Sequence, residues 1–186
     1  MRIVPGLLGA CLLLTACSEP GPPAPAVTVT APTTAPSVDP ATLDWLDGFC
    51  SAIHGYRKRT NAEAAPSEPG SVVEVQKALS EQLGGIADRT GEVVDRLTAL
   101  PPAPVPLAET VRKAFLAKYT TARDRARDAK TALDRAKTGD VASQDPAMKA
   151  LEQAQQDVDG TYDPVAPLVE SRELMLAAAS APGCKA

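Results

Sequence analysis

Residues 71–100 read SVVEVQKALSEQLGGIADRTGEVVDRLTAL, and this stretch decides the fold class. Ser71 and Glu74 have the spacing of a capping box, in which the two side chains accept backbone N–H groups at the start of a helix. Apolar residues then recur at steps of three or four, as on one face of an α-helix, apart from one step of seven with Thr90 at its midpoint. These apolar residues are Val72, Val75, Leu79, Leu83, Ile86, Val93, Leu97 and Leu100. Within the helix, Gly84-Gly85 predicts a bend or a close helix crossing.

Similar stripes predict one helix on each side of this one. Asp39-Pro40 is a cap followed by proline at the first helical position, and the stripe behind it fades near Thr60. Pro101-Pro102 should end the central helix, and the next helix opens near Pro106 and closes at Gly139. The stripe before the central helix is Leu43, Leu46, Phe49, Cys50, Ile53 and Tyr56. The stripe after it is Leu107, Val111, Phe115, Tyr119, Ala122, Ala126, Ala129, Leu133 and Ala136.

A fourth helix is predicted to open at Asp145-Pro146 and to continue roughly to Ala179. Gly160, Pro164 and Pro167 should break or kink it, because proline removes a backbone donor and clashes with the preceding turn. The expected apolar stripe is Met148, Leu151, Val158, Tyr162, Val165, Val169 and Leu176.

The predicted fold is all-α. No persuasive alternating strand is present, and the connections of about 5 to 10 residues suit antiparallel neighbours. We therefore expect residues 39–186 to form an antiparallel up-and-down four-helix bundle with a broken fourth helix. Aromatic residues make up only 3% of the chain, so the core must consist mainly of Leu, Val, Ile and Ala. A net charge of −4 argues against a nucleic-acid partner.

The N-terminus carries the pattern of an export signal. Arg2 gives a short positive region, and Ile3–Leu14 is an apolar region of about 12 residues, too short to span a bilayer. It ends in Leu14-Thr15-Ala16-Cys17, which resembles the lipobox of bacterial lipoproteins. This resemblance implies that residues 1–16 are removed and that Cys17 receives a diacylglycerol, which would hold the chain at the extracytoplasmic face of the cell membrane. A composition rich in Ala, Pro, Asp and Arg is similar to that of lipoproteins from high-GC Gram-positive bacteria.

Two alternatives remain open at this end. Leu8-Gly9-Ala10-Cys11 also fits the lipobox pattern, although a cut there leaves a very short apolar region and exposes Leu12-Leu13-Leu14. The other alternative is an ordinary secretory signal with a chance cysteine. After the signal, residues 17–38 carry six prolines, which favour extended backbone and predict a semi-rigid linker.

Two cysteines remain after the proposed lipidation, Cys50 and Cys184. Exported chains meet oxidising conditions, in which an even pair of cysteines usually forms a disulfide. Cys50 lies in the first predicted helix and Cys184 follows the last one, and these two helices are neighbours in an up-and-down bundle. We therefore predict a bond between Cys50 and Cys184.

Other chemical motifs are weak. Asp47, Cys50 and His54 share one helix face and form a metal-site hypothesis, which fails if Cys50 is oxidised. A haem held by His54 with Met148 or Met175 is a second hypothesis. The segment from Asp157 to Asp163 has acids around a glycine, but in the wrong order for a calcium-binding EF-hand loop, so a capped helix break is expected instead.

Charged runs point to a solvated helix surface. Arg57-Lys58-Arg59 is basic, and Arg123 to Lys137 alternates in sign, which is typical of local ion pairs on an exposed face. Lipid-headgroup binding is the functional alternative for the basic run.

Three classes of function remain. The first is a non-enzymatic envelope lipoprotein with no cofactor, whose bundle binds a protein or cell-wall partner. The second is an extracytoplasmic protein that binds a lipid or a small ligand, for which a contiguous apolar cavity would be expected. The third is an enzyme, which would need a pocket that holds His54 together with an acid such as Asp44 or Asp47.

Overall fold

The computed structural model describes residues 38–63 and 70–185, and all of its regular structure is helical. All of the described residues belong to one unit of the chain, Pro36–Ala186. The signal peptide, both candidate lipobox cysteines and nearly all of the predicted linker therefore lie outside the described residues. Within the described part, no helix combines the length and apolar character needed to cross a membrane.

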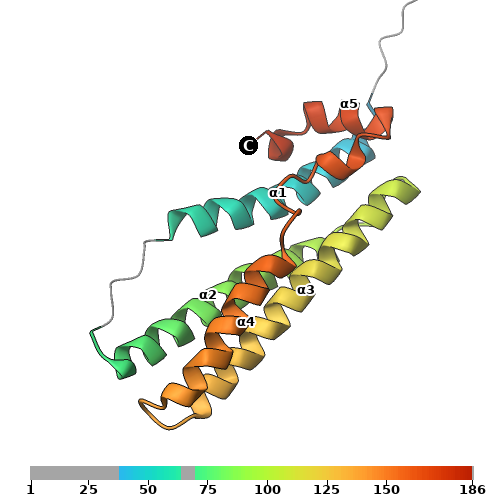
Figure 1. Ribbon diagram of the computed structural model, residues 1–186. Helices are drawn as coiled ribbons and strands as arrows, with labels where there is room; N and C mark the ends of the chain where they lie inside the picture. Colours follow the sequence, from blue (N-terminus) through green and yellow to red (C-terminus); the bar gives the residue numbers. More distant parts are fainter. Residues whose placement is uncertain (1–37, 64–69, 186) are drawn as a thin grey trace, which may run out of the picture. The chain divides into compact units, whose positions relative to one another are not determined.

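Five α-helices make up the domain and confirm the all-α prediction (Figure 1). They are α1 (Pro40–Ala62), α2 (Val72–Ala99), α3 (Pro106–Arg135), α4 (Gln144–Asp157) and α5 (Arg172–Ser180). Three short 3₁₀ turns accompany them, namely η1 (Val141–Ser143), η2 (Ala166–Leu168) and η3 (Pro182–Cys184).

The helix starts follow the expected capping chemistry. The Asp39 carboxylate accepts the Thr42 N–H at 2.9 Å, and Pro40 occupies the first helical position of α1. At the start of α2, Ser71 Oγ accepts the Glu74 N–H at 3.3 Å. Glu74 reaches back and accepts the N–H of Gly70 at 2.8 Å, one residue earlier than in the standard capping box.

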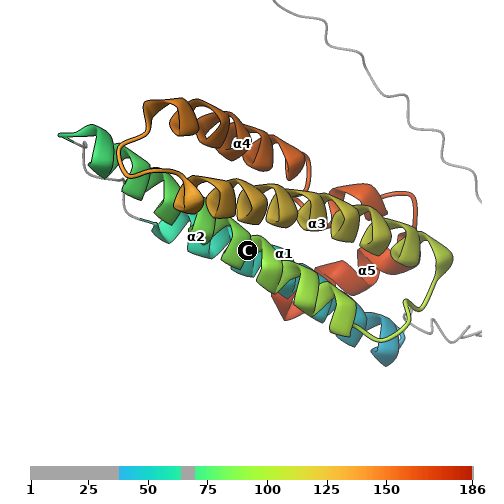
Figure 2. The same cartoon turned by 90° about the horizontal axis from the view of Figure 1, so that it is seen from below.

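α2 and α3 form the largest helix pair and run antiparallel (Figure 1). α4 packs on both of them, and the view from below shows it lying along α3 (Figure 2). Gly84 lies against the side chain of Lys130 on α3, where an added Cβ would come within 3.2 Å of its Cε atom. The atoms nearest to Gly84 belong to a flexible side chain, so the predicted bend or close crossing at Gly84-Gly85 remains a prediction.

Buried aromatic residues connect α1 to the α2–α3 pair. The Trp45 ring stacks on Phe49 at a centroid distance of 5.2 Å, and Phe49 meets Phe115 of α3 at 5.2 Å. Trp45 Nε1 donates to the carbonyl of Pro101 at 3.2 Å, so the buried indole has a polar partner. Thr90, at the gap in the α2 stripe, is fully buried. Its hydroxyl donates to the Ile86 carbonyl at 2.6 Å, so the buried polar group has a partner.

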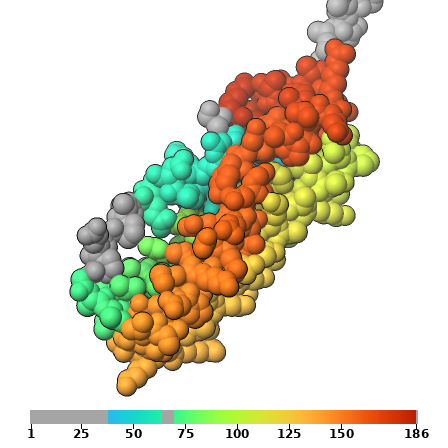
Figure 3. Space-filling model, viewed as in Figure 1, coloured from blue at the N-terminus to red at the C-terminus, as the bar shows by residue number. Residues whose placement is uncertain are grey.

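The fourth predicted helix is broken, as expected, but its two parts have different partners. α4 ends at Asp157, Gly160 takes a positive φ of 76°, and the Asp163 carboxylate accepts the Val165 N–H at 2.9 Å. The chain then crosses from α4 to α1, where α5 packs (Figure 3).

α5 also runs in an unexpected direction relative to α1. At its start, Glu173 lies 3.5 Å from the Thr42 hydroxyl in the first turn of α1. After its end, Cys184 bonds to Cys50, two turns further along α1. α5 therefore runs parallel to α1, whereas a continuous fourth helix of an up-and-down bundle would have run antiparallel to it.

The break also overturns part of the predicted fourth stripe. Four residues expected in the core are exposed, namely Met148, Tyr162, Val169 and Leu176. Leu168 and Leu174 are fully buried instead. For Val169 and Leu176 the reason is that the non-helical segment between α4 and α5 changes the angle at which the second part of the stripe faces the core. Tyr162 lies in that segment, and Met148 precedes it on α4, where Ala147 and Ala154 are the buried apolar residues.

Two leucines of α5 test this register. We expect Leu174→Ala to lower the free energy of unfolding by about 2–5 kcal/mol, because it leaves a cavity in the core. Leu176→Ala removes the same atoms from a residue that is 37% exposed, and it should cost less than about 1 kcal/mol. Urea unfolding of both variants measures the difference, and equal losses would contradict the position of α5.

Candidate functional site

The predicted disulfide between Cys50 and Cys184 is present. Their Cα atoms lie 4.8 Å apart, and the bond joins residues separated by 134 positions. Cys50 is fully buried on α1, whereas Cys184 is partly exposed in η3. The bond therefore fixes the C-terminal tail on the middle of the first helix.

Gly183 adds a second connection between the tail and α1. Its N–H donates to Asp47 Oδ1 at 2.6 Å, and its carbonyl oxygen lies 2.8 Å from His54 Nδ1. Asp47 precedes Cys50 by three residues and His54 follows it by four, so all three lie on one face of α1. A carbonyl oxygen can only accept, so His54 Nδ1 carries the proton.

The position of residue 183 requires glycine. An added Cβ would overlap Ser51 Oγ and the backbone oxygen of Asp47, at distances that real Cβ atoms do not show. The tail can therefore approach α1 closely enough for both hydrogen bonds only because residue 183 has no side chain. We call Asp47, Cys50, His54, Gly183 and Cys184 the tail clamp.

The tail clamp gives all three residues of the metal hypothesis, Asp47, Cys50 and His54, partners within the protein. The Cys50 sulfur is bonded to Cys184, and the two other side chains hold the backbone of Gly183. No group of three potential metal-ligating side chains occurs among the described residues. The three residues of the haem hypothesis lie on separate helices: His54 on α1, Met148 on α4 and Met175 on α5.

The surface beside the tail clamp is a basic depression of about 540 Å³. It is lined by Ser51, His54, Gly55, Arg57, Lys58, Asn61, Pro182, Gly183 and Lys185. Its lining contains three cationic side chains, Arg57, Lys58 and Lys185, and no carboxylate side chain. The third residue of the predicted basic run, Arg59, instead pairs with Glu92 of α2 at 2.9 Å.

A second depression of about 400 Å³ lies between α1, α2 and α4. Its lining residues are Tyr56, Thr60, Glu63, Ile86, Arg89, Glu152, Gln155, Gln156, Asp159 and Tyr162. Arg89 pairs with Glu63 at 2.8 Å. Burial raises the pKa of Tyr56, with a smaller contribution from Tyr162, so its hydroxyl stays protonated at neutral pH.

Two of the three acids in the suspected calcium loop, Asp157 and Asp163, have protein partners for their carboxylates. Arg125 donates to the Asp157 carboxylate at 2.7 Å, and Asp163 caps the turn before η2. The segment is a capped break between helices, as predicted. The charged run on α3 also forms the expected local pairs, with Arg127 on Asp124 at 3.0 Å and Lys130 on Asp134 at 2.5 Å.

Comparison with known proteins assigns no function to this chain. Family models, curated proteins and solved structures give no match to this chain. The tail clamp and the two depressions are therefore the features that bear on function.

Substitution of Gly183 tests the tail clamp. We expect Gly183→Ala to lower the free energy of unfolding by about 1–3 kcal/mol, because its methyl group overlaps α1. Gly91→Ala, within α2, is the matched control, since its added Cβ would make only ordinary contact with the Arg123 side chain of α3. That control should be neutral or stabilising by up to about 1 kcal/mol. Chemical denaturation measures both, and an unaffected Gly183→Ala variant would contradict the close approach.

Proposed function

We propose that this chain is an extracytoplasmic lipoprotein whose helical domain is a non-enzymatic module for binding a protein or cell-wall partner. Residues 1–16 are the signal that is removed, and Cys17 carries the lipid. The observation that carries the proposal is the bond between Cys50 and Cys184. Disulfides persist in oxidising compartments and are rare in the cytosol, so the bond agrees with the export pattern at the N-terminus.

The lipobox pattern and the linker give this proposal its geometry. Acyl chains hold a protein at a membrane because each buried methylene contributes about 0.8 kcal/mol. Residues 18–38 would extend to about 65 Å at the ~3.1 Å per residue of a proline-rich spacer. A domain on such a spacer is able to reach partners well away from the membrane surface.

The tail clamp supports a binding role over an enzymatic one. The chain has a single histidine, His54, and it holds the Gly183 carbonyl through Nδ1. Asp47, one of the two acids named as its possible partner, accepts the Gly183 N–H. Asp44, the other, is exposed and does not line the depression that contains His54. The side chains of Asp47 and His54 therefore hold the tail in place.

One observation favours small-ligand binding as a second candidate function. The depression between α1, α2 and α4 falls in the range of about 300–1,000 Å³ that is usual for ligand sites. The Nε atom of Arg89 is buried there without a hydrogen-bond partner among the described residues. The tyrosines and charged groups of its lining suit a polar ligand, not the apolar lipid considered from the sequence.

The lipid anchor is tested by metabolic labelling with a fatty acid. We expect label in the wild-type protein and in Cys11→Ala, because Cys11 belongs to the removed signal. Cys17→Ala should take up no label, since it lacks the acylated thiol. Label in Cys17→Ala but not in Cys11→Ala would move the site to Cys11. Absence of label from the wild type and from both variants would refute the lipoprotein assignment.

The compartment is tested by the state of the thiols. Protein isolated from the cell envelope should show no free thiol at Cys50 or Cys184, and unreduced mass mapping should join their peptides. Free thiols at both positions would contradict the export proposal, whatever the outcome of the labelling. Cross-linking in the intact envelope then tests for a partner, with the Cys184→Ser variant as the control for a displaced tail.

A further inference from the structure

The basic depression differs from the rest of the charged surface. Elsewhere on the domain most arginines have a carboxylate partner, such as Glu92 for Arg59 and Glu63 for Arg89. Arg57, Lys58 and Lys185 line one depression without an ion pair to any described residue. In a chain of net charge −4, three cations in a depression whose lining contains no acid create a local positive potential, which the nearby Asp47 carboxylate offsets only in part.

The donors in this depression come from two distant parts of the sequence. Arg57 and Lys58 lie on α1, and Lys185 follows η3 at the end of the chain. The bond between Cys50 and Cys184 brings these parts together. The depression is therefore assembled by the tail clamp and does not exist in either segment alone.

His54 contributes a further polar atom. Its Nδ1–H is used on the Gly183 carbonyl, which fixes the orientation of the ring. The side chain lines the depression, and in the neutral ring its remaining polar atom, Nε2, is an acceptor that pairs with a P–OH hydrogen and not with a charged oxygen. A ring that is held in place in this way loses little conformational freedom when a ligand binds.

We infer that the basic depression binds a phosphate group. The planar guanidinium of Arg57 matches two phosphate oxygens with parallel N–H donors, and the two lysine ammonium groups add point charges. Three cations around one depression suit an oxyanion with several charged oxygens better than a single carboxylate. This inference deepens the proposed function, because it names a ligand class for the binding module.

The phosphate has two sources with the same chemistry. One is a free phosphate or phosphate ester, and the other is the headgroup of an anionic phospholipid in the membrane that the proposed anchor would reach. The anchor and the site are independent properties of the chain. Loss of fatty-acid labelling would refute the anchor without affecting the titration of phosphate.

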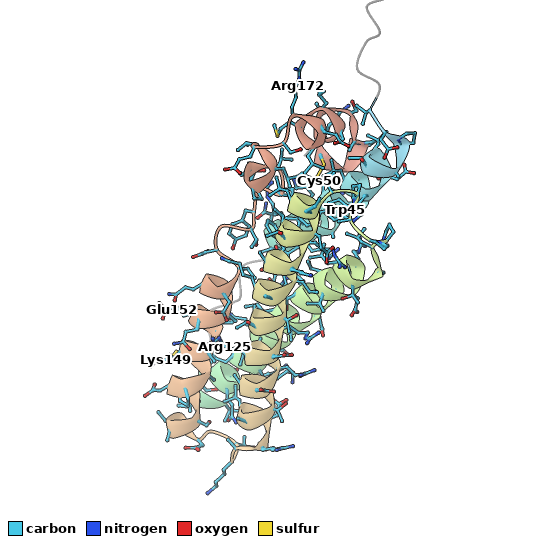
Figure 4. All side chains as sticks on the ribbon, turned by 90° about the vertical axis from the view of Figure 1, so that its right-hand side faces the viewer. Trp45, Cys50, Arg125, Lys149, Glu152 and Arg172 are labelled. Atoms are coloured by element: carbon cyan, nitrogen blue, oxygen red, sulfur yellow. A yellow bond between two sulfur atoms is a disulfide. The ribbon has the colours of Figure 1, made fainter. Side chains whose placement is uncertain are left out.

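The test is a calorimetric titration of the oxidised full chain with inorganic phosphate at moderate ionic strength. Arg57→Ala and Lys185→Ala should each weaken binding at least tenfold. Lys149→Ala is the matched control, because it removes the same charge from α4, on a part of the domain away from Cys50 (Figure 4). It should change the affinity less than twofold, and melting temperatures of all variants show that they fold.

A parallel arm uses sedimentation with vesicles of phosphatidylglycerol and of phosphatidylcholine. Binding of inorganic phosphate that needs Arg57 and Lys185 supports a site for free phosphate. Binding only to phosphatidylglycerol vesicles, with the same dependence, supports a lipid headgroup. Absence of both, or an equal loss in Lys149→Ala, would overturn the inference.

Reduction provides the last readout. Because the tail supplies Lys185, reduced protein should bind phosphate at least fivefold more weakly while most of its helix content remains. Equal affinity in oxidised and reduced protein, together with unchanged affinity in Lys185→Ala, would show that the tail is not part of the site.

Discussion

The contact between the C-terminal tail and α1 is the constraint on which the rest of the domain depends. Three helices that follow one another in the sequence, α2, α3 and α4, pack together. By contrast, α5 and η3 lie at the far end of the chain from α1, on which they pack. The bond between Cys50 and Cys184 closes a loop of 134 residues, and in the chain-entropy description this destabilises the unfolded state by about 5 kcal/mol. That contribution is large for a domain whose core contains few aromatic residues.

The broken fourth helix explains how this contact arises. A continuous helix after Asp157 would have run antiparallel to α1 along its whole length. The turn at Gly160 and the cap at Asp163 end α4 and send the chain across to the first turn of α1. From there α5 returns beside α1 and places Cys184 opposite Cys50, while Leu168 and Leu174 complete the core.

Most of the fold could be predicted because its signals are local. Caps at Asp39 and Ser71 and the stripes of the first three helices depend on residues close in sequence, and the structure retains them. The exception is Val72, which was expected in the core but is exposed in the first turn of α2. The fourth stripe was partly wrong, because a periodic pattern keeps its phase only while the helix is continuous, and Val169 and Leu176 lie beyond the break. The basic depression was only half visible: Arg57 and Lys58 are adjacent, but Lys185 joins them through a long-range bond. The predicted cysteine pair was the one signal that could have placed Lys185 beside them.

The two hydrogen bonds of Gly183 have a consequence for how the bond is formed. Asp47 and His54 grip the tail on either side of Cys50, and neither interaction needs the sulfur atoms to be joined. In a folded but still reduced chain these hydrogen bonds would bring the tail to α1 for part of the time, so the two thiols meet at a high effective concentration, as two ligands on one linker do. Oxidation then makes the docked position of the tail permanent. Cys50 and Cys184 are the only cysteines among the described residues, so within this part of the chain the step allows a single pairing.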